Sequence, residues 1–202
     1  MPEILLTRSF FELTDIETRA DDAGKTTIAG YAARFESLSV SFGGWFKEKI
    51  RAGAFAESLK KNNVRALWNH NMDMVLGSTK AGTLRLKEDD KGLRFELDLP
   101  DTQAGKDAAI SIKRGDVDGV SFGFRVLKQE WDEKDPKNVI RTLVEVDLRE
   151  ISPTAFPAYP ATSVKVRSVE EDYEEYRKES SKTQISVCEQ ETLNKLRMVE
   201  AL

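Results

Sequence analysis

Histidine and cysteine are almost absent from this chain of 202 residues, which contains one of each, His70 and Cys188. A structural zinc site normally takes four nitrogen or sulfur ligands and a catalytic one about three protein ligands, and two such donors cannot supply either kind. A single cysteine excludes an internal disulfide, which agrees with a reducing compartment. Histidine is also the side chain best suited to general-base catalysis near neutral pH. If the chain is a hydrolase of that kind, His70 is the only candidate base.

Long apolar stretches are missing too. No run of about 18 apolar residues occurs, so no transmembrane helix is expected. Residues 1–20 contain acids and lack a basic flank followed by an apolar stretch, so we expect no signal peptide. The net charge of −4 comes from residues 169–202, which hold nine acids and five bases, while residues 1–168 hold 26 of each. A neutral body lacks the clustered basic charge of a nucleic-acid surface. We therefore expect neither a nucleic-acid nor a membrane partner.

Residues 1–168 are predicted to form one β-rich domain. Strand-like segments separated by Gly, Asp or Pro turns recur along them, at 26–35, 64–70, 82–88, 92–99, 119–131 and 139–151. A short helix is expected at 53–59 and a second from about Gln103 to Arg114, with Asp101 or Thr102 as its N-cap and Gly115 as its end. This order favours a β-rich α+β fold, an antiparallel β-barrel with peripheral helices.

The pattern changes beyond Arg167. Residues 169–179 favour helix and lack β-branched runs, and Leu193, Leu196 and Val199 recur at helical spacing near the C-terminus. We expect residues 169–202 to form an acidic tail, helical or partly disordered, which engages a partner rather than completing the core.

Strand alternation places His70 at the end of segment 64–70, on one face with Ala66 and Trp68. A lone histidine on such a face is often a hydrogen-bonded structural residue. Its position alone therefore leaves its role open.

Ser121 lies between Gly119 and Gly123, on the face opposite to Val120 and Phe122. Small neighbours two residues away on either side are expected to leave its hydroxyl accessible to a substrate backbone. The alternative is a polar strand residue beside a bulge, and the pattern alone leaves both open.

Glu150 follows Val146 and Leu148 on the apolar face of its predicted strand. Burial of a carboxylate there is costly unless a group pairs with it, and a histidine N–H is a suitable partner. The alternative is that the alternation breaks before Pro153 and that Glu150 is solvated.

Around these three residues the chain resembles the prohead (capsid maturation) proteases of tailed bacteriophages, serine peptidases related to the herpesvirus assemblins. The resemblance extends from about Arg8 to Ser168 and rests on the order and spacing of short motifs. These are GYAARFESLS (30–39), GAF (53–55), ALWNH (66–70), VLGST (75–79), GTL (82–84), GLRF (92–95), RGD (114–116), GVSFGFRV (119–126) and EISPTAFPAYPATS (150–163).

The resemblance implies that Ser121 is the nucleophile and His70 the general base. The assemblins use a second histidine as third member of the triad, which this chain does not have. The resemblance therefore implies an acid in that place, Glu150, with Asp147 as the fallback. It also implies backbone oxyanion donors around residues 158–159.

The family further implies a serine endopeptidase without cofactor or metal, which acts in the host cytoplasm inside the assembling procapsid. Its substrates would be the scaffolding segment of the major capsid protein and the protease itself, and assembly into a homo-oligomer stays open. The rival is a noncatalytic head-assembly or scaffolding protein with the same barrel. A carboxylate-based hydrolase is disfavoured, because the sequence offers no convincing pair of acids.

Overall fold

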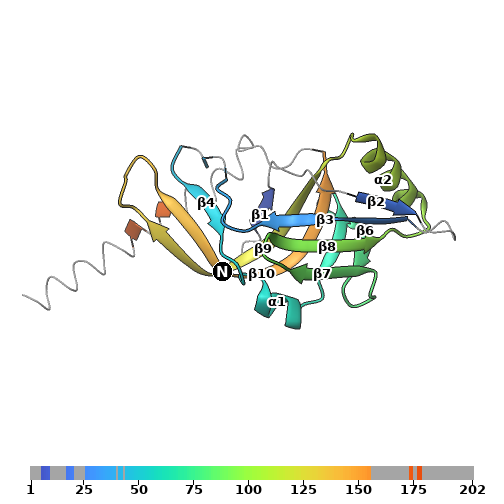
Figure 1. The fold of residues 1–202 in the computed structure, drawn as a ribbon, viewed down its shortest axis with the longest axis horizontal. Coiled ribbons are helices and arrows are strands. Elements are labelled where there is room, and N and C mark those ends of the chain that lie inside the picture. The colour runs from blue at the N-terminus through green and yellow to red at the C-terminus, as the bar shows by residue number, and fades with distance from the viewer. Residues whose placement is uncertain are drawn as a thin grey trace, which may run out of the picture. The chain divides into compact units, whose positions relative to one another are not determined.

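The alternating segments form two β-sheets in the structure, a computed structural model that describes residues 6–9, 17–20, 26–39, 41–42, 44–155, 173–174 and 177–178. In chain order the elements are β1 (Leu6–Ser9), β2 (Glu17–Ala20), β3 (Thr26–Arg34), β4 (Lys47–Ile50), α1 (Ala56–Lys61), β5 (Arg65–Trp68), β6 (Asn71–Ser78), β7 (Leu84–Glu88), β8 (Gly92–Asp98), α2 (Gln103–Arg114), β9 (Gly119–Asp132) and β10 (Ile140–Thr154). One sheet has the order β1-β9-β10-β5-β6, with β4 also paired to β10, and the other has the order β2-β3-β8-β7. Figure 1 shows the elements as a ribbon.

All six predicted strands occur, as β3, β5, β7, β8, β9 and β10. Alternation did not predict β1, β2, β4 and β6, of which three are only four residues long. The β-rich fold with few helices is confirmed. The barrel is not, because among the described residues no strand pairing closes either sheet on itself.

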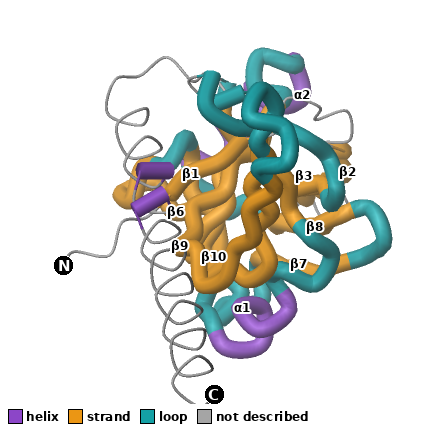
Figure 2. The backbone as a smooth tube through the Cα atoms, turned by 90° about the vertical axis from the view of Figure 1, so that its left-hand side faces the viewer, coloured by secondary structure: helices purple, strands orange, loops and turns teal. Residues whose placement is uncertain are grey.

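The second helix has the termini that the sequence predicts. The Thr102 side chain accepts a hydrogen bond from the Gly105 amide (3.2 Å), so Thr102 rather than Asp101 is the N-cap. At the other end Gly115 adopts φ 80°, a left-handed conformation that glycine reaches without steric cost. The short helix α1 begins at Ala56, three residues later than expected. Figure 2 shows the two helices at opposite ends of the strands.

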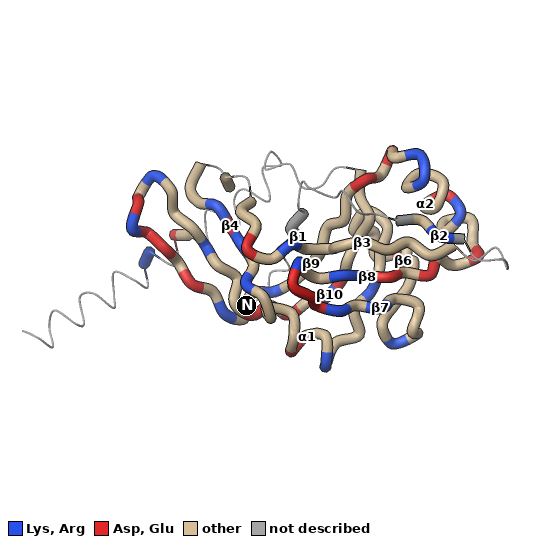
Figure 3. Tube along the Cα trace, in the orientation of Figure 1, with Lys and Arg blue, Asp and Glu red and all other residues tan. Residues whose placement is uncertain are grey.

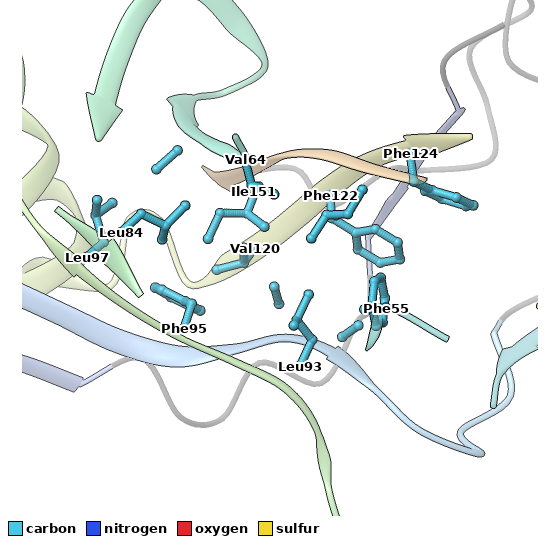
Figure 4. Packing of buried hydrophobic residues seen from close by; sticks show 14 of the residues in the cluster. Phe55, Val64, Leu84, Leu93, Phe95, Leu97, Val120, Phe122, Phe124 and Ile151 are labelled. Carbon is cyan, nitrogen blue, oxygen red and sulfur yellow. The ribbon is translucent and has the colours of Figure 1, made fainter. Parts of the chain in front are cut away.

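The core lies between the two sheets and is built from both. Leu93, Phe95 and Leu97 of β8 contribute from one sheet, and Phe122 and Phe124 of β9 from the other. Figure 4 shows these side chains facing each other, with the Phe55 ring beside that of Phe122. Burial of five such side chains contributes about 1.5–3 kcal/mol each before the loss of conformational entropy. The apolar face of β9 is therefore anchored in the core, and its opposite face carries Ser121.

The chain divides into two compact units. The first comprises residues 1–41 and 46–159, and the second comprises residues 42–45 and 160–202. The predicted boundary at residue 168 lies outside the described residues, as does nearly all of the acidic tail, and both stay predictions. Figure 3 shows acidic and basic residues interspersed along the described strands. Among the described residues, neither helix has the length and hydropathy needed to cross a lipid bilayer.

Candidate active site

His70 lies in a tight turn rather than in a strand. Asn69 and His70 form the two-residue connection between β5 and β6, and both have positive φ angles, 51° and 59°. Two consecutive positive φ angles are the signature of a type I′ hairpin turn, whose second position usually holds glycine. The prediction that His70 continues the face of Ala66 and Trp68 is therefore wrong, because the chain reverses after Trp68. A left-handed conformation costs a non-glycine residue roughly 1 kcal/mol or more.

The end of β10 holds this strained turn in place. The Asn69 amide donates to the Pro153 carbonyl (3.0 Å), and the Thr154 hydroxyl donates to Asn69 Oδ1 (2.8 Å). The His70 amide donates to Ser152 Oγ (3.1 Å). Three consecutive residues of β10 thus fix the turn that carries the histidine.

Glu150 reaches the histidine because β10 contains a bulge. Leu148 pairs with Phe124 of β9, but Glu150 pairs with Gly123, so the register shifts by one residue between them. Without this shift Glu150 would lie opposite Phe122, on the core face; instead Ile151 takes that position. A bulge changes the face to which the following side chains point. Glu150 is buried, as expected, but it lies on the face opposite to Leu148, and the expectation that it shares the apolar face is wrong.

The two side chains form the central contact of the site. His70 Nδ1 lies 2.8 Å from Glu150 Oε1, with the two side chains 27% and 8% exposed. Because a carboxylate only accepts hydrogen bonds, Nδ1 carries the proton in this contact. In the neutral ring, Nε2 is then the nitrogen that can accept a proton. This is the tautomer that a general base needs.

Ser121 shares a face with this pair. Ser121 pairs directly with Ser152 of β10, whose hydroxyl donates to Glu150 Oε2 (2.6 Å). Side chains directly opposite each other on antiparallel strands have Cβ atoms about 4.5–5.5 Å apart. The three predicted residues, Ser121, Glu150 and His70, thus lie on adjacent elements of one sheet, β9, β10 and the β5–β6 turn.

The accessible hydroxyl expected of Ser121 is not found, because Ser121 is fully buried. Its strand β9 lies between β10 on one side and β1 on the other, and Ser9 of β1 pairs with Ser121. The sequence did not predict β1, and therefore did not predict this neighbour.

Asp147, the fallback acid, points elsewhere. Its carboxylate accepts hydrogen bonds from Asn62 Nδ2 and from the Arg149 guanidinium. Glu150, not Asp147, is thus the acid that contacts His70.

Helix α1 supports β10 just before Glu150. The Ser58 hydroxyl donates to the Val146 carbonyl (2.8 Å) and accepts from the Leu148 amide (2.7 Å). Asn62 Nδ2 donates to the Leu148 carbonyl (2.9 Å). Backbone groups next to a bulge lose regular ladder partners, and these two side chains supply replacements. The roles of Ser58, Asn62 and Ser152 were not predicted from the sequence, although a serine facing inward on a short amphipathic helix is a detectable signal.

The proposed oxyanion donors at residues 158–159 and Cys188 lie outside the described residues. Within the part of the chain that the structure describes, no group of three or more His, Cys, Asp and Glu side chains is placed to hold a metal ion.

Sequence comparison with known proteins supports the family that the short motifs between Arg8 and Ser168 resemble. Residues 14–179 match the model of the caudovirus prohead serine proteases. The prohead protease of Enterobacteria phage HK97 is 32% identical to this chain over 163 residues. The alignment covers 78% of this chain and 66% of the HK97 protein, slightly less than two thirds of its length. The capsid assembly protease of bacteriophage T4 superposes with a TM-score of 0.48 at 11% identity, covering 74% of this chain and 98% of that one. The family match spans most of the chain, and the chain belongs to the caudovirus prohead serine proteases.

Proposed function

We propose that the chain is a serine endopeptidase of capsid maturation, in which Ser121, His70 and Glu150 form the catalytic triad. The observation that carries the proposal is the 2.8 Å contact between His70 Nδ1 and Glu150 Oε1 on the face that also carries Ser121. A carboxylate, a histidine and a serine in this order are the arrangement that activates a hydroxyl for attack on a carbonyl.

The mechanism follows from the roles of the three groups. Ser121 Oγ attacks the carbonyl carbon of the scissile peptide while His70 Nε2 takes its proton. Glu150 holds Nδ1–H and stabilises the imidazolium that forms. The imidazolium then protonates the leaving amine, and an acyl group remains on Ser121. Water, deprotonated by His70, releases the second product and restores the hydroxyl. Backbone amides must stabilise the oxyanion, and residues 158–159 stay our candidates.

The proposed substrates are the scaffolding segment of the major capsid protein and the protease itself. Membership of the prohead protease family supports the first. The pairing of β1 with β9 supports the second, because a segment of the chain itself lies alongside Ser121, with Ser9 opposite. We place this activity inside the assembling procapsid in the host cell.

Coexpression with the major capsid protein of the same phage tests the proposal. Wild type, Ser121→Ala and the control Ser111→Ala, a serine on α2, are compared by the intact masses of all products. Cleavage of both proteins by wild type and by Ser111→Ala, but not by Ser121→Ala, supports a serine endopeptidase. Undiminished cleavage with Ser121→Ala rules out the serine mechanism. Normal particles without any cleavage in wild type favour the rival, a noncatalytic assembly protein.

A further inference from the structure

Two residues that take no part in the proposed bond making and breaking at the substrate lie next to the Glu150 carboxylate. Ser152 is fully buried, and its hydroxyl contacts both partners of the triad contact. It donates to Glu150 Oε2 (2.6 Å) and accepts from the His70 amide (3.1 Å). A hydroxyl has one donor and two acceptor sites, so both bonds exist at once. Because its proton is committed to Glu150, the Ser152 hydroxyl acts as a bridge between the acid and the turn that carries the base.

Gly123 is the second of these residues, and it acts through the space it leaves. It lies directly opposite Glu150 in the β9–β10 register. A Cβ atom at position 123 would overlap Glu150 Oε1 and lie 3.1 Å from Cδ. Oε1 is the oxygen that accepts the His70 Nδ1 proton. The φ angle of Gly123 is not positive, so its backbone conformation is open to any residue. Glycine is needed at this position because a side chain would occupy the space of the Glu150 carboxylate.

We propose that Ser152 and Gly123 are positioning residues of the triad, which together hold the Glu150 carboxylate against His70 Nδ1. Ser152 fixes Oε2 and ties it to the histidine turn, while Gly123 leaves the space that Oε1 occupies. The inference rests on the proposed function for its effect on catalysis, but not for its effect on the histidine ring. Loss of either contact lets the carboxylate turn away, and the neutral ring then loses its preference for the Nδ1–H tautomer.

The single histidine makes this preference measurable. With ¹⁵N-labelled histidine, every imidazole signal of the full chain comes from His70. At a pH where the ring is neutral, the two ¹⁵N shifts report which nitrogen carries the proton. We expect the Nδ1–H form to dominate in wild type and in Ser152→Thr, which keeps the hydroxyl. Ser152→Ala and Gly123→Ala are expected to give a mixture of both tautomers.

Kinetics provide the second readout, in chains whose folding is checked by circular dichroism. Ser152→Ala and Gly123→Ala are expected to lower kcat for capsid-protein cleavage about 10- to 100-fold, by analogy with the loss when a residue that orients a metal-binding histidine is removed, with little change in KM. In a Glu150→Gln background, Gly123→Ala should cost little more, because residues that act through one partner are not additive.

Several outcomes overturn the inference. Folded Ser152→Ala and Gly123→Ala chains with the wild-type tautomer would contradict it, whatever the activity. Equal losses of kcat from Gly123→Ala with and without Glu150→Gln would show that Gly123 does not act through Glu150. If a variant at position 152 fails to fold, the tautomer and the kcat of Gly123→Ala test the inference by themselves. A wild-type chain that shows the expected tautomer but no Ser121-dependent cleavage would refute the proposed function and leave the positioning intact.

Discussion

Ser121 and Ser152 lie directly opposite each other on β9 and β10, and the second of these serines is hydrogen-bonded to both His70 and Glu150. Two buried serines thus share one face of one sheet with different surroundings. Ser152 donates its proton to the Glu150 carboxylate, and Ser121 is the serine that we propose as the nucleophile. The register of β9 and β10 thus gives each serine its own neighbours.

Glu150→Gln is expected to slow cleavage strongly. The amide keeps the size of the side chain but removes the charge that stabilises the imidazolium, and it can donate to the ring and select the wrong tautomer. We expect kcat to fall by about 10²- to 10⁴-fold, measured as the rate of capsid-protein cleavage. Asp147→Asn is the matched control, because Asp147 bonds to Asn62 and Arg149. A greater loss of kcat from Asp147→Asn than from Glu150→Gln would show that Asp147, not Glu150, is the acid of the triad.

Ser58→Ala is expected to reduce the stability of the fold. It leaves the Val146 carbonyl and the Leu148 amide without their hydroxyl partner in a buried place. We expect the free energy of unfolding to fall by about 1–3 kcal/mol, measured by urea denaturation. Lys60→Ala, an exposed change on the same helix, should stay within about 0.5 kcal/mol. Identical stabilities of both variants would show that α1 does not support the bulge of β10.

The buried ion pair between Arg141 of β10 and Glu48 of β4 tests how buried charges affect the stability of this strand pair. Arg141 Nη1 lies 3.3 Å from Glu48 Oε2, and the side chains are only 2% and 1% exposed. Arg141→Met removes the guanidinium that lies against the buried Glu48 carboxylate and is expected to cost about 3–5 kcal/mol. The double variant Arg141→Met/Glu48→Leu should recover much of this loss, since no buried charge remains. A double variant less stable than Arg141→Met would contradict this view of the pair.

Stability should fall at both ends of the pH range through Tyr31 and Asp89. The Tyr31 hydroxyl donates to Asp89 Oδ2 (2.7 Å), and this bond, with burial, raises the pKa of Tyr31. Its contribution is therefore complete below about pH 10, the unfolded pKa, and is lost as pH rises through the folded value. Burial opposes the charged form of Asp89, but hydrogen bonds from Tyr31 and from the Lys91 and Gly92 amides outweigh it and lower its pKa. That contribution is present above about pH 4 and is lost as pH falls through the folded value.

Tyr31→Phe removes the hydroxyl from this pair. We expect a loss of about 0.5–1.5 kcal/mol at neutral pH and a shallower decline of Tm above pH 10 than in wild type. Thermal melts from pH 3 to 11 provide the measurement. Parallel curves for both chains at alkaline pH would show that Tyr31 does not contribute to this decline.

Local patterns were sufficient to predict several elements of the fold. Both ends of α2 follow from Thr102 and Gly115, because a capping hydroxyl and a left-handed glycine act within a few residues. The long strands β9 and β10 follow from their alternation. Short strands such as β1 and β4 contain too few residues to show a period, and the barrel expected from the strand count remains unconfirmed.

The candidate site residues were chosen by residue type and resemblance, and the alternation of their strands did not predict their surroundings. Asn69-His70 lacks the glycine that normally marks a type I′ turn, so the reversal after Trp68 was not visible. The bulge before Glu150 depends on contacts from α1, about 90 residues away in the chain, and alternation within one strand contains no information about them. Burial of Ser121 depends on the register of β9 with two other strands.

Covalent labelling tests the central claim, that Ser121 is a nucleophile activated by His70, most directly. Lysates in which the capsid protein is being processed are treated with diisopropyl fluorophosphate. The oxygen of an activated serine attacks its phosphorus, fluoride leaves, and the diisopropylphosphoryl group stays on the serine, where tandem mass spectrometry locates it. We expect the phosphoryl group on Ser121 in wild type and its loss in His70→Ala. An adduct on Ser152 instead, or equal labelling of Ser121 in His70→Ala, would contradict the triad.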